Sequence, residues 1–140
     1  MEKLIINLRS WANAGKTTSL KKLYYLLTGV QCPDDEVREI FVYRGCKVGI
    51  TSLGDYREAV ECRLNELIAN QCDVIFCATR TKGGTADCLE QLADAHGYKK
   101  IIVGSNWAYD SEFRDICNSQ LSETMKGLLD KLIEYNSHGF

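Results

Sequence analysis

Gly15, Lys16, Thr17 and Thr18 place a flexible backbone, a cation and two hydroxyl groups at consecutive positions. These residue types suit the binding of a chain of phosphate groups, because a lysine ammonium can bridge phosphate oxygens and a threonine hydroxyl can ligate Mg²⁺. A glycine lets the backbone approach the phosphates, and the free N–H groups of a following helix point at them. The motif therefore predicts a phosphate-binding loop, if it lies between a strand and a helix.

The neighbouring sequence supplies that strand and that helix. The run from Leu4 to Leu8 is apolar apart from Asn7 and predicts a buried strand. From Thr17 to Thr28 the apolar residues recur at helical spacing, and Gly29 can end the helix. The alternative is that the motif only opens a helix and leaves Lys16 in water. The order of strand, glycine-containing loop and helix favours phosphate binding.

One position departs from the full pattern G-x-x-x-x-G-K-[ST]. Ser10 stands where that pattern has its first glycine. The first glycine mainly supplies a turn, so the change bears on the geometry of the loop and removes no ligand. We expect binding to survive it.

The stretch from Ser10 to Leu20, SWANAGKTTSL, resembles the loop of P-loop nucleoside triphosphatases. Within it, NAGKTT is similar to the loop of the ADP-ribosylation-factor-like small GTPases. The resemblance implies that the backbone from Asn13 through Ala14 and Gly15 to Thr18 binds a triphosphate. It also implies that Lys16 contacts the β- and γ-phosphates and that Thr17 ligates Mg²⁺.

Two GTPase motifs are altered in this chain. Thr51-Ser52-Leu53-Gly54 has threonine where D-x-x-G has its magnesium-linked aspartate, and the region from Ser105 to Asp110 lacks N-K-x-D. Recognition of guanine by an aspartate is therefore not supported, which favours either ATP or loose selectivity for the base. Trp107 follows the strand whose terminal loop, in P-loop proteins, commonly approaches the base, so it is a candidate base contact. Ordinary packing of this tryptophan is the alternative.

A carboxylate for Mg²⁺ must then come from elsewhere. Asp55 follows the third strand closely enough to lie near the loop, and with Glu58 it also forms a capping box for the next helix. Capping alone and capping with a magnesium contact both stay open. The acidic segment Asp34-Asp35-Glu36 is interpreted as a solvated loop.

The stretch ATRTKGGTAD, from Ala78 to Asp87, is a second candidate phosphate-facing loop. It leaves a strand with the cations Arg80 and Lys82 and enters a helix, whose free N–H groups favour anions. Arg80 is the candidate catalytic cation alongside Lys16. The alternative is an ordinary connection in which Thr85 caps the helix and the cations lie in water.

The remaining pattern predicts a fold class. Two β-rich runs flank Arg44-Gly45-Cys46 as a hairpin that ends near Thr51, and further strands are expected in DVIFCAT and KKIIVGS. Helices are expected after Asp55, from about Thr85 to His96, and from about Ser119 to Tyr135. The order β-α-β-β-α-β-α-β-α predicts a three-layer P-loop-like α/β domain with a mainly parallel five-strand sheet and one antiparallel hairpin.

Composition limits the other function classes. The chain has 140 residues and a formal net charge of -2, which fit one domain spanning residues 1–140 and give no basic stripe for nucleic acid. The N-terminal apolar run is too short for a signal peptide or a membrane span, so we expect a cytoplasmic protein. Seven cysteines without C-x-x-C are interpreted as reduced thiols used as apolar residues.

These inferences predict a nucleoside-triphosphate-binding protein, with ATP as the expected nucleotide and Mg²⁺ as its metal. Three function classes stay open: an ATPase or small phosphotransferase, a GTPase-like nucleotide switch, and a nucleotide-binding module without catalysis. The first class needs Lys16, Thr17, a cationic loop and a carboxylate that positions the nucleophile. The substrate that accepts a phosphoryl group and any protein partner are not indicated by the sequence.

Overall fold

The computed structural model describes residues 2–10, 15–81, 83–104 and 110–138. In these ranges the chain forms five strands and four helices in the predicted order. The strands are β1 (Leu4–Ser10), β2 (Arg38–Tyr43), β3 (Cys46–Thr51), β4 (Val74–Arg80) and β5 (Lys99–Gly104). The helices are α1 (Lys16–Thr28), α2 (Arg57–Ala69), α3 (Gly84–Ala95) and α4 (Ser111–His138).

The strands form one sheet in the order β2-β3-β4-β1-β5. Only the β2–β3 pair is antiparallel among the described strands, and the other pairs are parallel. The strand β1 therefore lies inside the sheet, with Ile6 opposite both Phe76 of β4 and Ile101 of β5. The predicted α/β class, the mainly parallel sheet and the antiparallel hairpin are confirmed. Because β1, β3 and β4 run in the same direction, their carboxyl ends meet at one edge.

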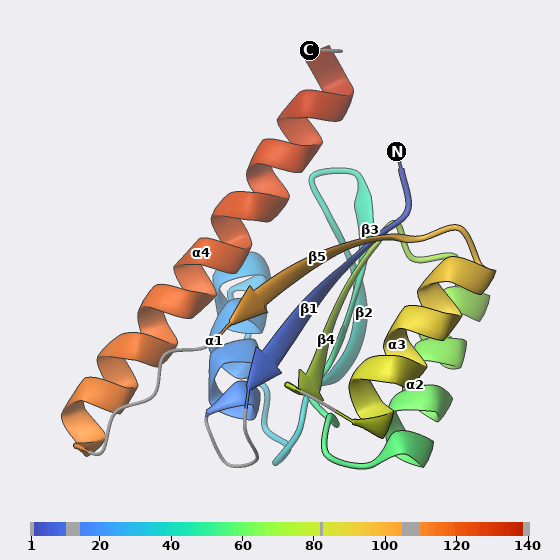
Figure 1. Cartoon of the computed structure of the whole chain (residues 1–140). Helices are drawn as coiled ribbons and strands as arrows, with labels where there is room; N and C mark the ends of the chain where they lie inside the picture. Colours follow the sequence, from blue (N-terminus) through green and yellow to red (C-terminus); the bar gives the residue numbers. More distant parts are fainter. Residues whose placement is uncertain (1, 11–14, 82, 105–109, 139–140) are drawn as a thin grey trace.

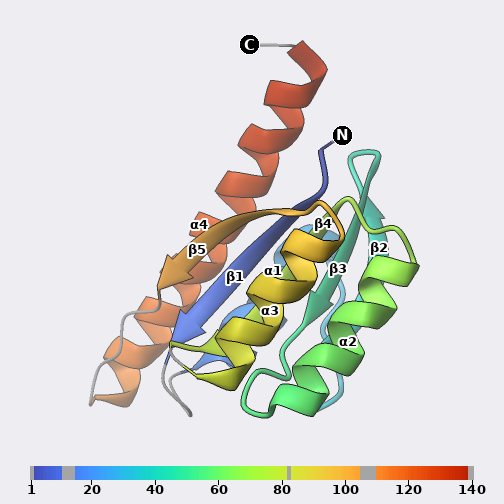
Figure 2. The ribbon, with the colours of Figure 1, turned by 45° about the vertical axis from the view of Figure 1, so that its right-hand side comes forward.

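Helices cover both faces of the sheet. Figure 1 shows α1 and α4 on one face and α2 and α3 on the other, and Figure 2 shows the same three layers after rotation. Side chains alternate along β1, so Ile6 and Leu8 pack in the core beneath α1 and α4, whereas Ile5 packs in the core beneath α2 and α3. The α1 residues Leu20 and Leu23 are wholly buried, and each contributes roughly 1.5–3 kcal/mol of burial free energy.

The last helix is longer than the sequence analysis predicted. It begins at Ser111 rather than near Ser119. Its first turn is capped by Asp110, whose Oδ1 accepts a hydrogen bond from the N–H of Glu112 at 2.9 Å. The first two turns carry exposed apolar residues, Phe113 and Ile116, instead of a buried stripe. Their sequence therefore lacks the apolar periodicity that revealed the later turns.

The cysteines are free thiols, as expected. Five of them are buried, at positions 32, 46, 72, 77 and 88. Burial raises the pKa of the Cys77 thiol to about 12, because the protein interior disfavours the charged thiolate. None of the helices in the described part of the chain is both long enough and apolar enough to cross a membrane.

Candidate functional site

The amino terminus of α1 meets the edge where β1, β3 and β4 end. Gly15 precedes the helix with φ of 82°, in the left-handed region that favours glycine, and its carbonyl accepts the N–H of Ser19 at 2.9 Å. The N–H groups of Lys16, Thr17 and Thr18 therefore precede the first helical hydrogen bond of α1. The first turn carries no acidic side chain. This helix end is free to attract an anion.

Lys16 is almost wholly buried, with 5% of its side chain exposed, and Nζ lies 2.9 Å from Oδ1 of Asp55. The sequence analysis expected Asp55 to cap α2. That expectation is wrong, because the residue at the N-cap is Tyr56 and no side chain makes a capping hydrogen bond there. The carboxylate of Asp55 instead faces the lysine of the predicted phosphate loop, because the end of β3 approaches the start of α1.

Close packing at the end of β4 fixes the segment that carries Asp55. A Cβ atom on Gly54 would lie 2.4 Å from the carbonyl oxygen of Ala78, so the backbone can approach β4 this closely only with glycine at that position. Just before it, Ser52 receives the Val37 N–H on its Oγ at 2.8 Å and donates its own N–H to the Val37 carbonyl at 3.1 Å. These contacts also bring the neighbouring Glu36 to the same edge.

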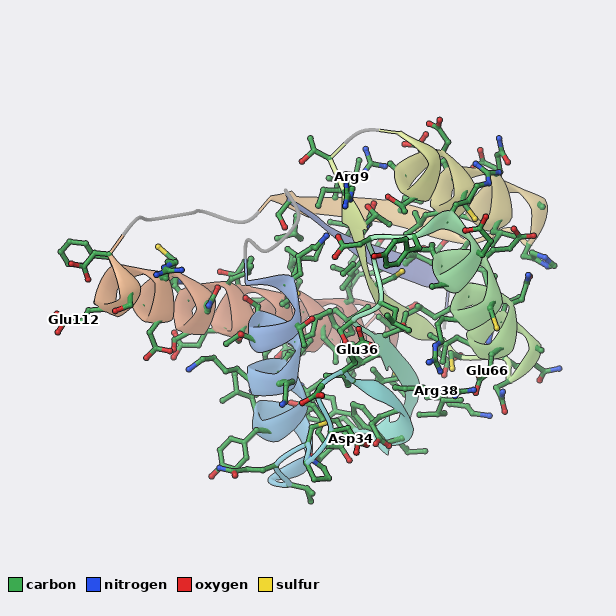
Figure 3. The ribbon with its side chains drawn as sticks, turned by 90° about the horizontal axis from the view of Figure 1, so that it is seen from below. Arg9, Asp34, Glu36, Arg38, Glu66 and Glu112 are labelled. Carbon is green, nitrogen blue, oxygen red and sulfur yellow. The ribbon has the colours of Figure 1, made fainter. Side chains whose placement is uncertain are left out.

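A cavity of about 530 Å³ opens at this edge. Predicted site residues that line it are Gly15, Lys16, Thr17, Thr18 and Asp55. Other lining residues come from the segment before β2, from the end of β3 and from α4: Glu36, Ser52, Leu53, Gly54, Tyr56, Ser111, Arg114, Asp115 and Asn118. Figure 3 looks onto this edge of the molecule, with Glu36 near its centre and Glu112 at the outer end of α4.

Sequence reasoning missed the contributions of Glu36 and of α4. Glu36 was interpreted as part of a solvated acidic loop, and its side chain is exposed, yet it also lines the cavity. Arg114 and Asn118 reach the cavity because α4 begins eight residues before the expected position, at Ser111 rather than Ser119. Asp110 followed by an acidic first turn was the sequence signal that could have revealed this earlier start.

Arg80 lies at the end of β4 and faces the same carboxylate as Lys16. Its Nε is 3.6 Å from Oδ1 of Asp55, and its side chain is about half exposed. Its backbone N–H donates to Oγ1 of Thr85 at 3.1 Å. Thr85 is thus not the N-cap of α3, as the alternative for this loop had it; Gly83 occupies that position, with no side-chain capping bond. The hydroxyl instead holds the backbone of Arg80.

A polar network joins β1 to β4 and to α3 near the same edge of the sheet. Asn7 donates from Nδ2 to the Cys77 carbonyl at 3.1 Å and to Thr79 Oγ1 at 3.0 Å, which ties β1 to β4. Arg9 donates to Oδ1 of Asn7 and, through a second nitrogen, to Glu90 of α3, both at 2.7 Å. The hydrogen bond from Arg9 to Glu90 and the charge of Arg9 lower the pKa of the Glu90 carboxyl. Figure 3 marks Arg9 at this edge.

The other predicted site residues have different outcomes. Ser10, at the position of the first glycine of the motif, is buried at the end of β1 and pairs in the sheet with Arg80. Thr51, at the position of the GTPase aspartate, is buried, and its Oγ1 has no hydrogen-bond partner among the described residues. Asn13, Ala14 and Trp107, together with Lys82, lie outside the residues that the structure describes.

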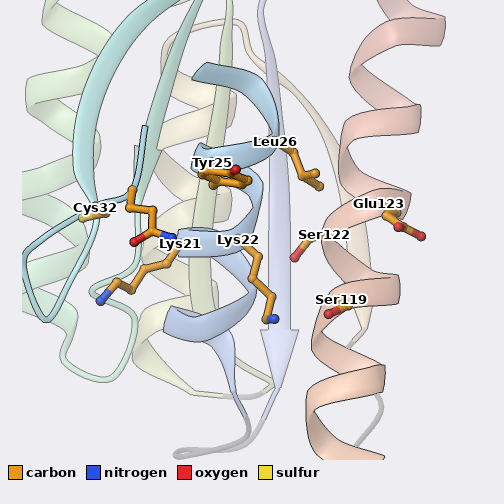
Figure 4. Close-up of a pocket in the computed structure, with 9 residues that line it drawn as sticks. Lys21, Lys22, Tyr25, Leu26, Cys32, Ser119, Ser122 and Glu123 are labelled. Carbon is orange, nitrogen blue, oxygen red and sulfur yellow. The ribbon is translucent and has the colours of Figure 1, made fainter. Parts of the chain in front are cut away.

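A second cavity, of about 490 Å³, lies between α1 and α4. Figure 4 shows Lys22 and Leu26 of α1 on the side of Ser119 and Ser122 of α4, whereas Lys21 points the other way, toward the segment of Cys32. None of the predicted site residues that the structure describes lines this cavity. Within the described ranges, no group of three or more His, Cys, Asp or Glu side chains is arranged to hold a metal ion.

No model of a known protein family matches the chain, and no curated protein sequence matches it. Assignment of a function therefore depends on the geometry and chemistry of the cavity at the amino terminus of α1.

Proposed function

We propose that the chain is a nucleoside-triphosphate-binding protein of the P-loop type and that it binds ATP at the amino terminus of α1. One observation carries the proposal: the buried Lys16 lies beside Gly15, Thr17 and Thr18 in a cavity of about 530 Å³ at the carboxyl ends of the strands. A strand, a glycine-containing loop and a helix bearing this lysine are the elements that hold phosphate groups. The same arrangement supports a P-loop-like fold.

In this proposal Lys16 leaves the carboxylate of Asp55 and binds the phosphate oxygens of the nucleotide instead. Its ammonium group pairs with Asp55 at 2.9 Å in the structure, and a polyphosphate supplies several oxygens of higher charge. The N–H groups at the start of α1 add donors that need no reorganisation. Arg80, whose Nε lies 3.6 Å from the same carboxylate, is also available to a phosphate that enters the cavity.

Mg²⁺ fits the donors at this edge. The hydroxyl of Thr17 and the carboxylate of Asp55 line one cavity, and both are oxygen ligands of the kind that Mg²⁺ accepts. A larger cluster of protein ligands is not needed, because Mg²⁺ usually keeps several waters and binds substrate phosphates. When bound, the ion would neutralise charge on the phosphate oxygens.

The reaction class that this site suits is phosphoryl transfer to water or to a small acceptor. Such reactions need positioning and charge stabilisation more than covalent chemistry. Lys16 holds the phosphates, and Arg80 stabilises the charge that develops on the transferred group. Asp55 and Glu36 are two carboxylates on the cavity wall that can orient an attacking hydroxyl or water, whereas Asp115, the third, pairs with Lys22.

The test is to measure binding and consumption of ATP and GTP in parallel on the purified chain. We expect saturable ATP binding that Mg²⁺ strengthens, weaker GTP binding, and release of phosphate above the protein-free rate. Binding without phosphate release would favour a nucleotide-binding module without catalysis. Absence of binding to either nucleotide would overturn the proposal.

A further inference from the structure

A polar stripe on α4 forms one wall of the candidate nucleotide site. Ser111, Arg114, Asp115 and Asn118 line the same cavity as Gly15 and Lys16. Their spacing of three and four residues places them on one face of the helix. This wall comes from the end of the chain, whereas the phosphate loop comes from its beginning.

The side-chain amide of Asn118 lies directly against the loop glycine. A Cβ atom built on Gly15 would lie 2.5 Å from Oδ1 and 2.9 Å from Nδ2 of Asn118. Only 9% of Asn118 is exposed, and its Oδ1 accepts a hydrogen bond from Oγ of Ser19 at 3.1 Å. The oxygen of the amide is thus satisfied from α1.

The nitrogen of the same amide has no acceptor assigned among the described residues. None of the hydrogen bonds formed between described residues uses Nδ2 of Asn118. An amide N–H that makes no such bond can donate to a ligand oxygen, and a hydrogen bond to a charged oxygen is stronger than one to a neutral oxygen. Since Asn118 lines the cavity next to Gly15, an acceptor in the cavity would satisfy this donor.

The contacts of α4 with α1 hold the amide in place. Oγ of Ser122 donates to the Ser19 carbonyl at 2.8 Å, and Lys22 forms an ion pair with Asp115 at 3.2 Å. Met125 is wholly buried in the core that the two helices share. Figure 4 shows Ser122 on the side of α4 that faces α1. A donor held in this way binds an anion without a further cost of ordering.

We propose that Asn118 donates from Nδ2 to an oxygen of the phosphate group that Gly15 and Lys16 bind, and that α4 thereby forms part of the polyphosphate site. Arg114, one turn earlier on the same face, makes no ion pair with another described residue and adds a positive charge to this wall. This inference rests on the proposed function and names a ligand group that the loop motif does not include.

Two substitutions at Asn118 separate phosphate binding from a structural role. Asn118→Asp keeps an oxygen that can accept from Ser19 but replaces the donor by a negative charge, and Asn118→Ala removes the whole amide. Ser122→Ala is the structural control, since it removes a hydrogen bond between α4 and α1 and leaves Asn118 intact. Gln120→Glu is the charge control, because it adds a negative charge on the same helix at an exposed position that does not line the cavity.

The measurement is calorimetric titration with ATP and with inorganic triphosphate, after thermal melting has confirmed that each variant is folded. We expect Asn118→Ala to weaken the binding of both ligands by about 10- to 100-fold, as for the loss of a hydrogen bond to a charged group. Asn118→Asp should weaken both further. Ser122→Ala should lower the melting temperature with less than about threefold loss of affinity, and Gln120→Glu should leave affinity unchanged within the same factor.

Parent-like affinity in folded Asn118→Ala would overturn the inference and leave the proposed function intact. Loss of ATP affinity with unchanged binding of inorganic triphosphate would also overturn it, because the contact would then be with the nucleoside. If the parent chain itself bound neither ligand, the proposed function would fail first. If Asn118→Asp does not fold, Asn118→Ala alone decides between these outcomes.

Discussion

Oδ1 of Asp55 lies 2.9 Å from Nζ of Lys16 and 3.6 Å from Nε of Arg80, so one carboxylate oxygen faces two cations of the candidate phosphate site. Asp55 thus pairs with the same cations that a bound phosphate would need as partners. A nucleotide must displace this carboxylate or bring a cation that neutralises it. We therefore expect Asp55 to compete with metal-free ATP for Lys16 and Arg80. When ATP carries Mg²⁺, we expect Asp55 to favour binding by ligating the metal.

Asp55→Asn tests this double role. Without the negative charge, Lys16 and Arg80 are free to bind phosphate, so we expect metal-free ATP to bind about 3- to 10-fold more tightly. The gain in affinity that Mg²⁺ gives the parent should largely disappear, because a magnesium ligand is lost. Titration with ATP in the presence of Mg²⁺ or of a chelator measures both effects.

Asp115→Asn is the matched control, since Asp115 lines the same cavity but pairs with Lys22. It should leave the effect of Mg²⁺ unchanged. An equal effect of Mg²⁺ in the parent and in Asp55→Asn would contradict the magnesium role of Asp55.

Arg80→Ala should lower turnover more than it weakens ATP binding. Its planar guanidinium can stabilise charge as it develops on the transferred phosphoryl group, an interaction made mainly in the transition state. Lys82→Ala should have a smaller effect, because a flexible lysine makes a less oriented contact. ATP affinity and phosphate release are measured for each variant, with folding checked by thermal melting. Full turnover in Arg80→Ala would assign this loop a structural role only.

Gly15→Ala should destabilise the fold by about 1–3 kcal/mol, through left-handed backbone strain and a clash with the amide of Asn118. Gly29→Ala is the matched control, because Gly29 has φ of 74° but nothing within 4 Å of an added Cβ. Denaturant unfolding of both variants separates the cost of backbone strain from the cost of the clash with Asn118. Equal destabilisation would show that Asn118 does not restrict Gly15.

Cys77 and Cys62 should differ sharply in reactivity. Burial raises the pKa of Cys77 to about 12 from 9.0, whereas Cys62 is exposed. A raised folded-state pKa contributes stability that is present below pH 9.0 and is lost as the pH rises towards 12. At pH 8.5, iodoacetamide should label Cys62 in the native protein and Cys77 only after unfolding, as read by peptide mass spectrometry. Rapid labelling of native Cys77 would contradict its burial.

The strands and the hairpin were predictable because their signals are local. The apolar run at Leu4 and the turn at Arg44-Gly45 specify strand positions through periodicity and turn chemistry alone. The first turns of α4 were not predictable from periodicity, because Phe113 and Ile116 are exposed there. Their start depends on one capping residue, Asp110.

The loop of the candidate site was predictable, and so was the nearness of Asp55 and Arg80, but the contributions of Glu36 and α4 were not. Gly15, Lys16 and Thr17 are consecutive, so their chemistry can be read from one stretch of sequence. Asp55 follows a capping pattern that the tertiary structure overrides, since the charge of Lys16 competes for the same carboxylate. Asn118 reaches the site through helix packing between the two ends of the chain, and no local pattern encodes that contact.

Calorimetric titration of ATP into the parent chain and into Lys16→Ala, both with Mg²⁺, decides whether Lys16 binds the phosphates of the nucleotide. Lys21→Ala is the control, since Lys21 lies on the same helix but lines the other cavity. We expect saturable binding of ATP to the parent and to Lys21→Ala, and at least about 100-fold weaker binding to Lys16→Ala, because a buried cation that contacts phosphate is removed. Equal ATP affinity in the parent and in a folded Lys16→Ala protein, or no binding to the parent, would contradict this expectation.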